Sequence, residues 1–157
     1  MHITSKSRYA IKIMLDIAKH DGEGVVRRKE IATRQGVPLE YLDQILSRLR
    51  KAGLLFSTRG PNGGYQLAKT FRQITAWEIF AAVEDYIFPV ICLNPEAHCQ
   101  HEHICETQGA WEKIFQSIYQ PLNSLKLSDL MASPKSSLHI DPTINTMICS
   151  AGSAMHG

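Results

Sequence analysis

Three cysteines and three histidines lie within one stretch of 14 residues, CLNPEAHCQHEHIC, between positions 92 and 105. The members of this group are Cys92, Cys99, Cys105, His98, His101 and His103. Thiolate sulfur and imidazole nitrogen are donors by which proteins hold zinc and iron–sulfur clusters. Spacing alone does not separate the two, because both kinds of centre accept the same donors. The stretch therefore predicts a metal centre, against the plainer alternative of unligated thiols and solvated imidazoles.

The rest of the chain suggests no disulfide role for these thiols. The first ten residues, MHITSKSRYA, hold no apolar core before a small-residue cleavage site and are not typical of a secretory signal. No apolar run approaches the roughly 18 residues needed to span a bilayer. We therefore expect a cytoplasmic protein with no membrane partner, in which thiols stay reduced. Cys149, far from the other three in the sequence, is expected to be a bystander thiol.

Charge is divided unevenly along the chain. Residues 1–72 carry 14 Lys and Arg against 6 Asp and Glu, a net charge of +8. Residues 73–157 carry 3 Lys and Arg against 9 Asp and Glu, a net charge of −6. Such a division predicts a module that binds a polyanion, joined to a part that does not touch it.

Hydrophobic periodicity predicts three helices in the basic half. The first is an amphipathic helix around residues 10–18, with Thr4 or Ser5 placed to cap it. The second, RKEIATRQ, stops at Gly36, and the third begins two residues later and ends at Gly53. Two short helices joined by the turn QGVP form a helix-turn-helix.

A hairpin follows these helices. LLFSTR and YQLAK have the composition of strands, and GPNGG between them is rich in turn-forming residues. Three helices and a hairpin in this order describe a winged helix-turn-helix. The predicted fold class is therefore mainly α with a small β-hairpin, in which a winged helix-turn-helix domain precedes a long C-terminal dimerisation helix.

A winged helix-turn-helix binds double-stranded DNA by laying the polar face of its second helix in the major groove. Gln44 suits a bidentate contact with adenine, and the carboxylates of Glu40 and Asp43 suit the amino group of cytosine. Arg59, at the base of the hairpin, is the expected minor-groove contact. The predicted DNA-binding residues are Arg28, Glu40, Tyr41, Asp43, Gln44, Ser47, Arg48, Lys51, Arg59 and Gly60, with Arg27 and Lys29 as further phosphate contacts.

The acidic half contains a helix start and an apolar stripe. Thr75 and Glu78 form a capping box, which predicts a helix that begins there. An apolar residue then recurs at intervals of 4, 3, 4 and 3, which is typical of a coiled-coil seam, although such a stripe also packs within a domain. The stripe comprises Trp111, Phe115, Ile118, Leu122 and Leu125. Pro121 is expected to kink or end the helix nearby.

These features divide the chain into four segments. Residues 1–85 form the predicted DNA-binding domain, and residues 86–106 form the Cys/His loop. Residues 107–131 are the predicted dimerisation helix region. Residues 132–157, which are small, polar and contain proline, are expected to be a disordered tail.

Four stretches, ITSKSRYA, RQGVPLEYLDQILSRLRKAGL, RGPNGGYQLAK and ITAWEIFAAVE, precede the three-cysteine loop. With that loop, they make the chain resemble the IscR/NsrR/RirA family of winged-helix iron–sulfur transcription regulators over about residues 1–131. The first 70 residues are most similar to IscR members. The resemblance implies base reading from Glu40, Asp43 and Gln44, with Arg59 in the minor groove. It also implies a homodimer on a pseudo-palindromic operator and one iron–sulfur cluster per protomer, with [2Fe-2S] favoured and [4Fe-4S] possible.

The fourth cluster ligand departs from the pattern of that family. IscR-like members place a histidine three residues after the third cysteine, where this chain has Gln108. Nitric-oxide-sensing relatives use an acidic residue near the N-terminus, where this chain has Arg8, a group without a lone pair to donate. Imidazole has precedent as a cluster ligand, which favours His103. The candidates, in order of preference, are His103, His101, Glu106 and Gln108.

The predicted function is a DNA-binding transcription regulator whose operator affinity is controlled by an iron–sulfur cluster. Its target genes would serve iron–sulfur cluster assembly or the response to iron, redox state or nitric oxide. A zinc-binding winged-helix regulator is the alternative, followed by a small iron–sulfur electron-transfer protein. The sequence contains no nucleotide-phosphate loop and no triad-like arrangement, so we do not expect an enzyme.

Overall fold

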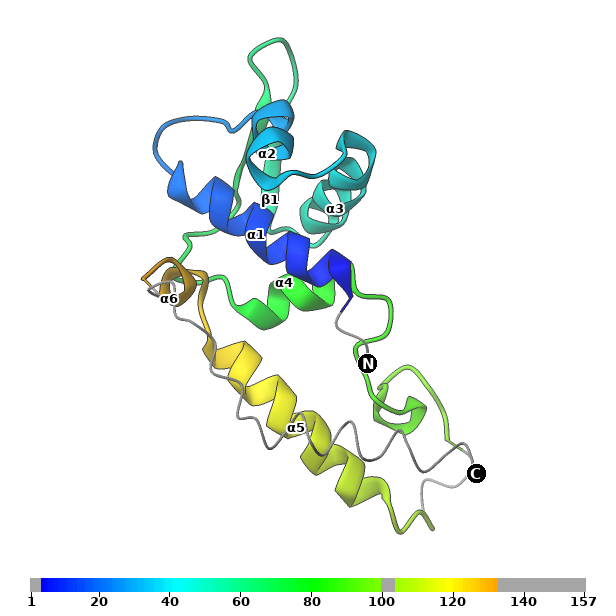
Figure 1. The fold of residues 1–157 in the computed structure, drawn as a ribbon. Coiled ribbons are helices and arrows are strands. Elements are labelled where there is room, and N and C mark those ends of the chain that lie inside the picture. Colours follow the sequence, from blue (N-terminus) through cyan, green and yellow to red (C-terminus); the bar gives the residue numbers. More distant parts are fainter. Residues whose placement is uncertain (1–3, 100–103, 133–157) are drawn as a thin grey trace, which may run out of the picture.

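The computed structural model describes residues 4–99 and 104–132, whose arrangement is shown in Figure 1. In chain order the elements are α1 (Ser5–Lys19), α2 (Arg28–Gln35), α3 (Leu39–Lys51), β1 (Leu55–Thr58), β2 (Gly64–Leu67), α4 (Ala76–Val83), the 3-10 helix η1 (Ile91–Leu93), α5 (Gln108–Ser124) and α6 (Leu127–Ala132). Helices dominate and a two-stranded antiparallel hairpin follows α3, which confirms the predicted winged-helix fold. No helix in the described part of the chain is long and apolar enough to cross a membrane.

Several helix ends are set by residues whose chemistry suits a terminus. The Oγ1 atom of Thr4 accepts a hydrogen bond from the backbone N–H of Lys6 at 3.1 Å and caps α1. Thr75 and Glu78 form the predicted capping box of α4, in which the Glu78 N–H donates to Thr75 Oγ1 at 3.1 Å. Gly36 ends α2 with a left-handed φ of 62°, a conformation that favours glycine. These boundaries follow from local signals in the sequence.

The hydrophobic core lies where α1 packs against α2, α3, α4 and α6. α1 contributes Ile13, Met14 and Ile17 to it, and none of these side chains is more than 1% exposed. α3 contributes its apolar face, which comprises Leu42, Ile45, Leu46 and Leu49. Burial of one such side chain stabilises the fold by about 1.5–3 kcal/mol, so the core fixes which face α3 turns outward.

The wing, defined here as β1, residues 59–63 and β2, is joined to the start of α2. In the hairpin Leu55 lies opposite Leu67. Beside β2, Val26 and Tyr65 exchange two backbone hydrogen bonds of 2.9 Å each. A Cβ atom on Gly64 would lie 2.5 Å from the carbonyl oxygen of Val26, so this close approach requires glycine. The basic residues that directly follow Val26 are thereby held next to the wing.

The C-terminal part forms two helices where the sequence predicted a single helical region. The chain turns after α5, and α6 returns to pack against α1. Leu127, the first residue of α6, is fully buried in the core, and its N–H donates to the Ile74 carbonyl at 2.8 Å. Residues 133–157, which include Cys149 and all but the first residue of the predicted tail, lie outside the described residues.

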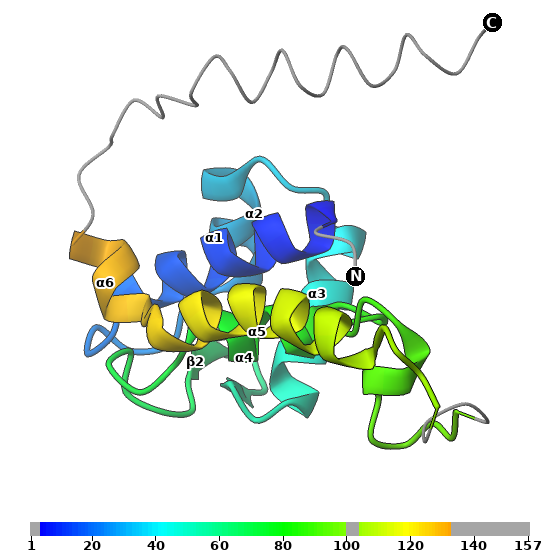
Figure 2. The ribbon, with the colours of Figure 1, turned by 90° about the horizontal axis from the view of Figure 1, so that it is seen from below.

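α5 runs alongside α4 and leaves the core, as Figures 1 and 2 show. None of its residues is buried within the chain. One of its sides contacts Trp77 of α4, whose ring meets those of Phe115 and Tyr119 edge to face, with centroids 5.7 and 4.9 Å apart. Phe88, from the segment after α4, lies 5.3 Å from the Phe115 ring. The helix ends at Ser124, soon after Pro121, as expected near a proline.

Asp16 is a buried carboxylate that ties α1 to α2. It is 6% exposed, and it accepts hydrogen bonds from Arg34 Nε at 2.9 Å and Arg34 Nη2 at 2.8 Å. Gln35 Nε2 donates to it as well, at 3.1 Å. The hydrogen bond to Asp16 raises the pKa of Arg34. This group of contacts holds the end of α2 directly before the turn into α3.

We expect Asp16→Asn to lower the free energy of unfolding by about 2 kcal/mol, because the neutral amide leaves the guanidinium of Arg34 without its charged partner. Chemical denaturation followed by circular dichroism measures the change. Asp21→Asn, at an exposed aspartate after α1, is the control and should shift stability by no more than about 0.5 kcal/mol. Equal stability of Asp16→Asn and the parent protein would contradict this role.

Candidate nucleic-acid interface and cysteine loop

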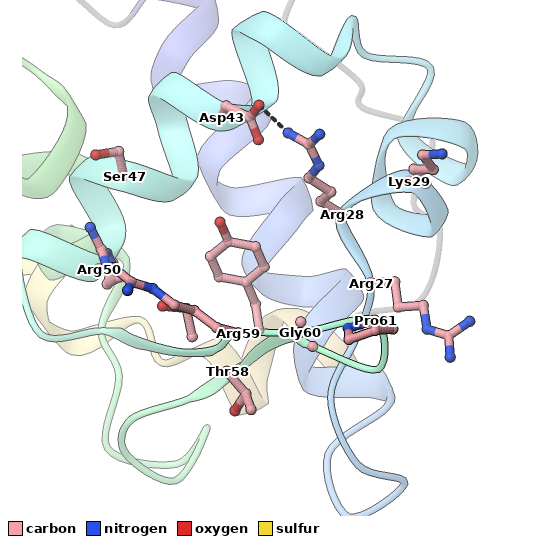
Figure 3. Close-up of a pocket in the computed structure, with 14 residues that line it drawn as sticks. Arg27, Arg28, Lys29, Asp43, Ser47, Arg50, Thr58, Arg59, Gly60 and Pro61 are labelled. Carbon is pink, nitrogen blue, oxygen red and sulfur yellow. Dashed lines mark hydrogen bonds and ion pairs between the residues drawn. The ribbon is translucent and has the colours of Figure 1, made fainter.

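A groove of about 680 Å³ lies between the start of α2, the polar face of α3 and the wing, as shown in Figure 3. The cationic residues that line it are Arg27, Arg28, Lys29, Arg50 and Arg59. Asp43 is the acidic residue in the lining. A concave surface with this excess of positive charge attracts a phosphate backbone. The groove is therefore the candidate nucleic-acid interface.

Two contacts hold the basic residues of α2 in place. Arg28 Nη1 donates to Asp43 Oδ2 of α3 at 2.5 Å, as Figure 3 shows. Both side chains remain about half exposed. Arg27 Nη2 donates to Asn62 Oδ1 of the wing at 3.0 Å. The start of α2 is thus linked both to the predicted recognition helix and to the wing. An exposed ion pair contributes little stability, so its main effect here is on geometry.

The other predicted contacts on α3 lie in different surroundings. Glu40, Gln44 and Lys51 are exposed, and Ser47 lines the groove. Tyr41 faces the start of α1 instead. Its hydroxyl lies 3.1 Å from Ser5 Oγ, and its ring meets that of Tyr9 edge to face at 5.8 Å. The roles of these side chains in base reading remain predictions.

Arg48 extends toward the end of α4 rather than into the groove. Its Nη1 atom donates to the backbone carbonyl of Val83 at 3.0 Å and to Asp85 Oδ1 at 2.7 Å. In the wing, Arg59 and Gly60 are both exposed and line the groove, and Gly60 has a φ of 114° that suits glycine. Arg59, the predicted minor-groove contact, therefore lines the groove, whereas Arg48 has internal partners.

Arg50 is a groove residue that the sequence reasoning did not single out. It lies in the last turn of α3, three positions after Ser47, and both side chains line the groove. Residues three apart share a face of a helix, so the spacing from Ser47 was the available signal. Ser57 and Thr58 of β1 add hydroxyl groups to the same lining.

The cysteine loop joins α4 to α5 and carries three free thiols. Cys92 lies in η1, and Cys92, Cys99 and Cys105 are each partly buried. Cys105 Sγ lies 3.4 Å from Thr107 Oγ1, and the hydrogen bond from this hydroxyl, assisted by nearby backbone N–H groups, lowers the pKa of the Cys105 thiol. A lowered pKa favours the thiolate, the form that binds metals.

The described residues do not bring the ligands together into a finished site. Within the ranges 4–99 and 104–132, no three metal-binding side chains form a group placed around one ion. His101 and His103 lie outside the described residues. Glu106 is exposed, and Gln108 is the first residue of α5 and is half-buried. The assignment of all these ligands therefore remains a prediction.

A helix-turn-helix with a basic groove beside a β-wing defines a DNA-binding domain. A family model described as an iron-dependent transcriptional regulator matches residues 3–133. The chain belongs to this family, Rrf2, which confirms the resemblance noted in the sequence.

Relatives and solved structures agree with this assignment. The HTH-type transcriptional regulator IscR of Photobacterium profundum is 42% identical over 131 residues, which cover 83% of this chain and 76% of that protein. Protein rrf2 of Nitratidesulfovibrio vulgaris is 38% identical over 146 residues, which cover 90% and 97% respectively. The structure of CymR, the global cysteine regulator of B. subtilis, superposes with a TM-score of 0.67 at 36% identity, covering 84% and 97% of the two chains. The chain is therefore a transcription regulator and not an enzyme.

Arg59→Ala should weaken binding to an operator selected in vitro from random duplexes by about tenfold, because the minor groove concentrates negative potential around an inserted arginine. The slope of log affinity against log salt should fall by about 0.9 for one lost phosphate interaction. Fluorescence anisotropy over a salt series measures both quantities. The control is Arg72→Ala, at an exposed arginine outside the groove whose guanidinium lies over Phe71, and it should leave both unchanged. Equal affinity of Arg59→Ala and the parent would rule out the minor-groove role.

Proposed function

We propose that the protein is a DNA-binding transcription regulator whose operator affinity is controlled by an iron–sulfur cluster held by Cys92, Cys99 and Cys105. The observation that carries the proposal is the presence of three free, partly buried thiols on one loop. That loop is attached at residue 85 to a winged-helix domain with a basic groove. The IscR relative and the family description support an iron-linked signal.

The donor chemistry of the loop fits an iron–sulfur cluster. Cluster iron prefers thiolate ligands, and the contacts of Cys105 with Thr107 already favour its thiolate form. A bound cluster, with [2Fe-2S] favoured over [4Fe-4S], would supply a centre that responds to iron or redox conditions. The chain's own residues would hold this centre next to the DNA-binding domain. Genes for cluster assembly or for iron, redox or nitric-oxide responses are the expected targets, and the cytoplasm is the expected location.

The fourth ligand is assigned to His103 first and to His101 second. Gln108 offers a neutral amide oxygen, a hard donor poorly suited to cluster iron, although it occupies the position of the family's histidine. Glu106 is exposed beside the third cysteine and offers a carboxylate. A histidine ligand binds only as the neutral imidazole, so cluster retention should weaken as the pH falls.

Zinc is the second candidate for the loop. Three thiolates and one imidazole also satisfy a tetrahedral zinc site, and the same donors serve both metals. CymR, a solved structure similar to this chain, is described as a global cysteine regulator. Regulators with this fold are therefore not all described as iron-dependent. Metal content separates the candidates directly.

We propose a homodimer joined through α5. The large apolar side chains that α5 leaves exposed in the chain are Trp111 at 37% and Ile114 at 44%, and Leu125, directly after the helix, is 36% exposed. Ile114 lies about 100° around the helix axis from Phe115, which contacts Trp77, and Trp111 lies one turn before Phe115 on the adjoining part of the helix surface. A second copy of α5 would cover them and give a two-fold dimer suited to a pseudo-palindromic operator.

Cys92→Ala, Cys99→Ala and Cys105→Ala should each lose bound iron and sulfide after anaerobic reconstitution, because each removes one thiolate. Metal and sulfide assays with visible absorption spectra measure the loss. Cys149→Ala is the matched control and should retain the cluster. Colourless parent protein with stoichiometric zinc would overturn the cluster in favour of a zinc site. Unaltered spectra of both His101→Ala and His103→Ala would exclude the histidine ligand.

Ile114→Asp should convert a dimer into a monomer at micromolar concentration, because an unpaired carboxylate would be buried in the apolar seam. Sedimentation velocity measures the mass in solution. Gln116→Asp places the same charge at an exposed position of the same helix and should leave the dimer intact. A parent protein that sediments as a monomer would show that the exposed side of α5 is not a dimer interface.

A further inference from the structure

The start of α1, the end of α4 and the first residues of the cysteine loop lie side by side, as Figure 1 shows. Glu84, which follows α4, accepts hydrogen bonds from the backbone N–H of Thr4 at 3.1 Å and from its hydroxyl at 2.7 Å. The hydroxyl of Ser7 donates to the same carboxylate oxygen. Burial alone would raise the pKa of Glu84, but the hydrogen bonds from Ser7 and Thr4 outweigh it and lower the pKa. The chain is thus fixed to α1 directly before the loop.

The next residue, Asp85, makes the corresponding link to α3. Its carboxylate accepts from Arg48 Nη1 at 2.7 Å and from Lys6 Nζ at 3.2 Å. The same Arg48 nitrogen donates to the carbonyl of Val83, in the last turn of α4, at 3.0 Å. A cation at this position also interacts favourably with the negative end of the helix dipole. Arg48 therefore joins the predicted recognition helix to the two ends of a three-residue segment, Val83 to Asp85.

Arg48 lies on the polar side of α3, where a DNA contact is the ordinary expectation. Two observations argue against that role. Arg48 does not line the basic groove, whereas Ser47 and Arg50 on either side of that position do. Its Nη1 atom already has a carbonyl and a carboxylate as partners. A DNA phosphate would have to displace both.

We propose that Arg48 and Asp85 form a positioning pair that sets the angle of α3 for operator binding and connects that angle to the cysteine loop. The connection to the loop rests on the function proposed above. Asp85 is adjacent in sequence to Tyr86, the first residue of the loop segment, so a change in the backbone of the loop acts on Asp85 through one peptide bond. The position of Asp85 then acts on α3 through the guanidinium of Arg48. The pair is exposed, with side-chain exposures of 38% for Arg48 and 53% for Asp85, so it contributes little to the stability of the fold.

Asp85→Asn should change operator affinity in opposite directions depending on whether Arg48 is a phosphate contact or a positioning residue. If Arg48 were a phosphate contact, its release and the loss of a negative charge would strengthen operator binding. A positioning pair predicts weaker binding, by about three- to fivefold, because α3 loses an anchor. Asp85→Glu keeps the carboxylate and should return affinity to within about twofold of the parent. The control is Glu112→Gln, which removes an exposed carboxylate from α5, on the far side of the molecule from the wing, and should change nothing.

The salt dependence of binding provides an independent readout. Arg48→Gln should weaken operator binding without changing the slope of log affinity against log salt. A lost phosphate contact would lower that slope by about 0.9. The double variant Arg48→Gln with Asp85→Asn should bind no more weakly than Arg48→Gln alone, because the two residues act as one unit. Stronger binding by Asp85→Asn, a reduced slope for Arg48→Gln or additive losses in the double variant would each overturn the proposal.

The connection to the loop is tested by measuring the parent and Asp85→Asn as apoprotein and after anaerobic reconstitution. Asp85→Asn should retain the iron and sulfide content of the parent, while the ratio of operator affinities between the two forms moves toward one. A ratio equal to that of the parent would overturn the connection. If the parent takes up no cluster, the proposed function fails, yet the affinities and salt slopes of the apoproteins still decide whether Arg48 positions α3.

Discussion

The orientation of α3 depends on the burial of its apolar face. Leu42, Ile45, Leu46 and Leu49 are each no more than 1% exposed, and they pack into the core around α1. To turn α3 so that two of these side chains met water would cost about 3–6 kcal/mol, whereas an exposed ion pair contributes about 1 kcal/mol or less. Burial therefore selects the face that α3 presents to the groove. The ion pairs around α3 then adjust the angle of that face.

Two such pairs tie α3 to different neighbours. Arg28 links it through Asp43 to α2, and Asp85 links it through Arg48 to the segment after α4. The first pair lies inside the groove and the second lies outside it. The first therefore comes into reach of a bound phosphate, while the second stays among protein groups. Since both act on a helix that the core already holds, neither is needed for folding, and both remain available to tune binding.

Features that depend on neighbouring residues were predictable from the sequence. Thr4 begins a helix through its own hydrogen bond, Thr75 begins one with Glu78, and Gly36 ends one through its φ angle, so the sequence signals and the structure agree. α6 was not predictable in this way, because it depends on the burial of Leu127 against α1, a contact between distant parts of the chain. A six-residue helix also has too short a repeat to stand out as a periodic pattern.

On the polar face of α3, the partners of single side chains were also not predictable from the sequence, because they depend on contacts with distant parts of the chain. The sequence indicated Arg48 and not Arg50 as a DNA contact, whereas in the structure Arg48 donates to the end of α4 and Arg50 lines the groove. The start of the loop that follows α4 is held in two ways. Polar contacts join Glu84 to the start of α1 and Asp85 to Arg48 of α3, and the ring of Phe88 contacts Phe115 of α5. Under the proposed coupling, a change in the loop would act in two directions, toward α3 of its own chain and toward the exposed side of α5. In the proposed dimer, α5 contacts the partner chain. One loop would therefore influence both the angle of α3 and the distance between the two copies of α3 that bind the operator half-sites.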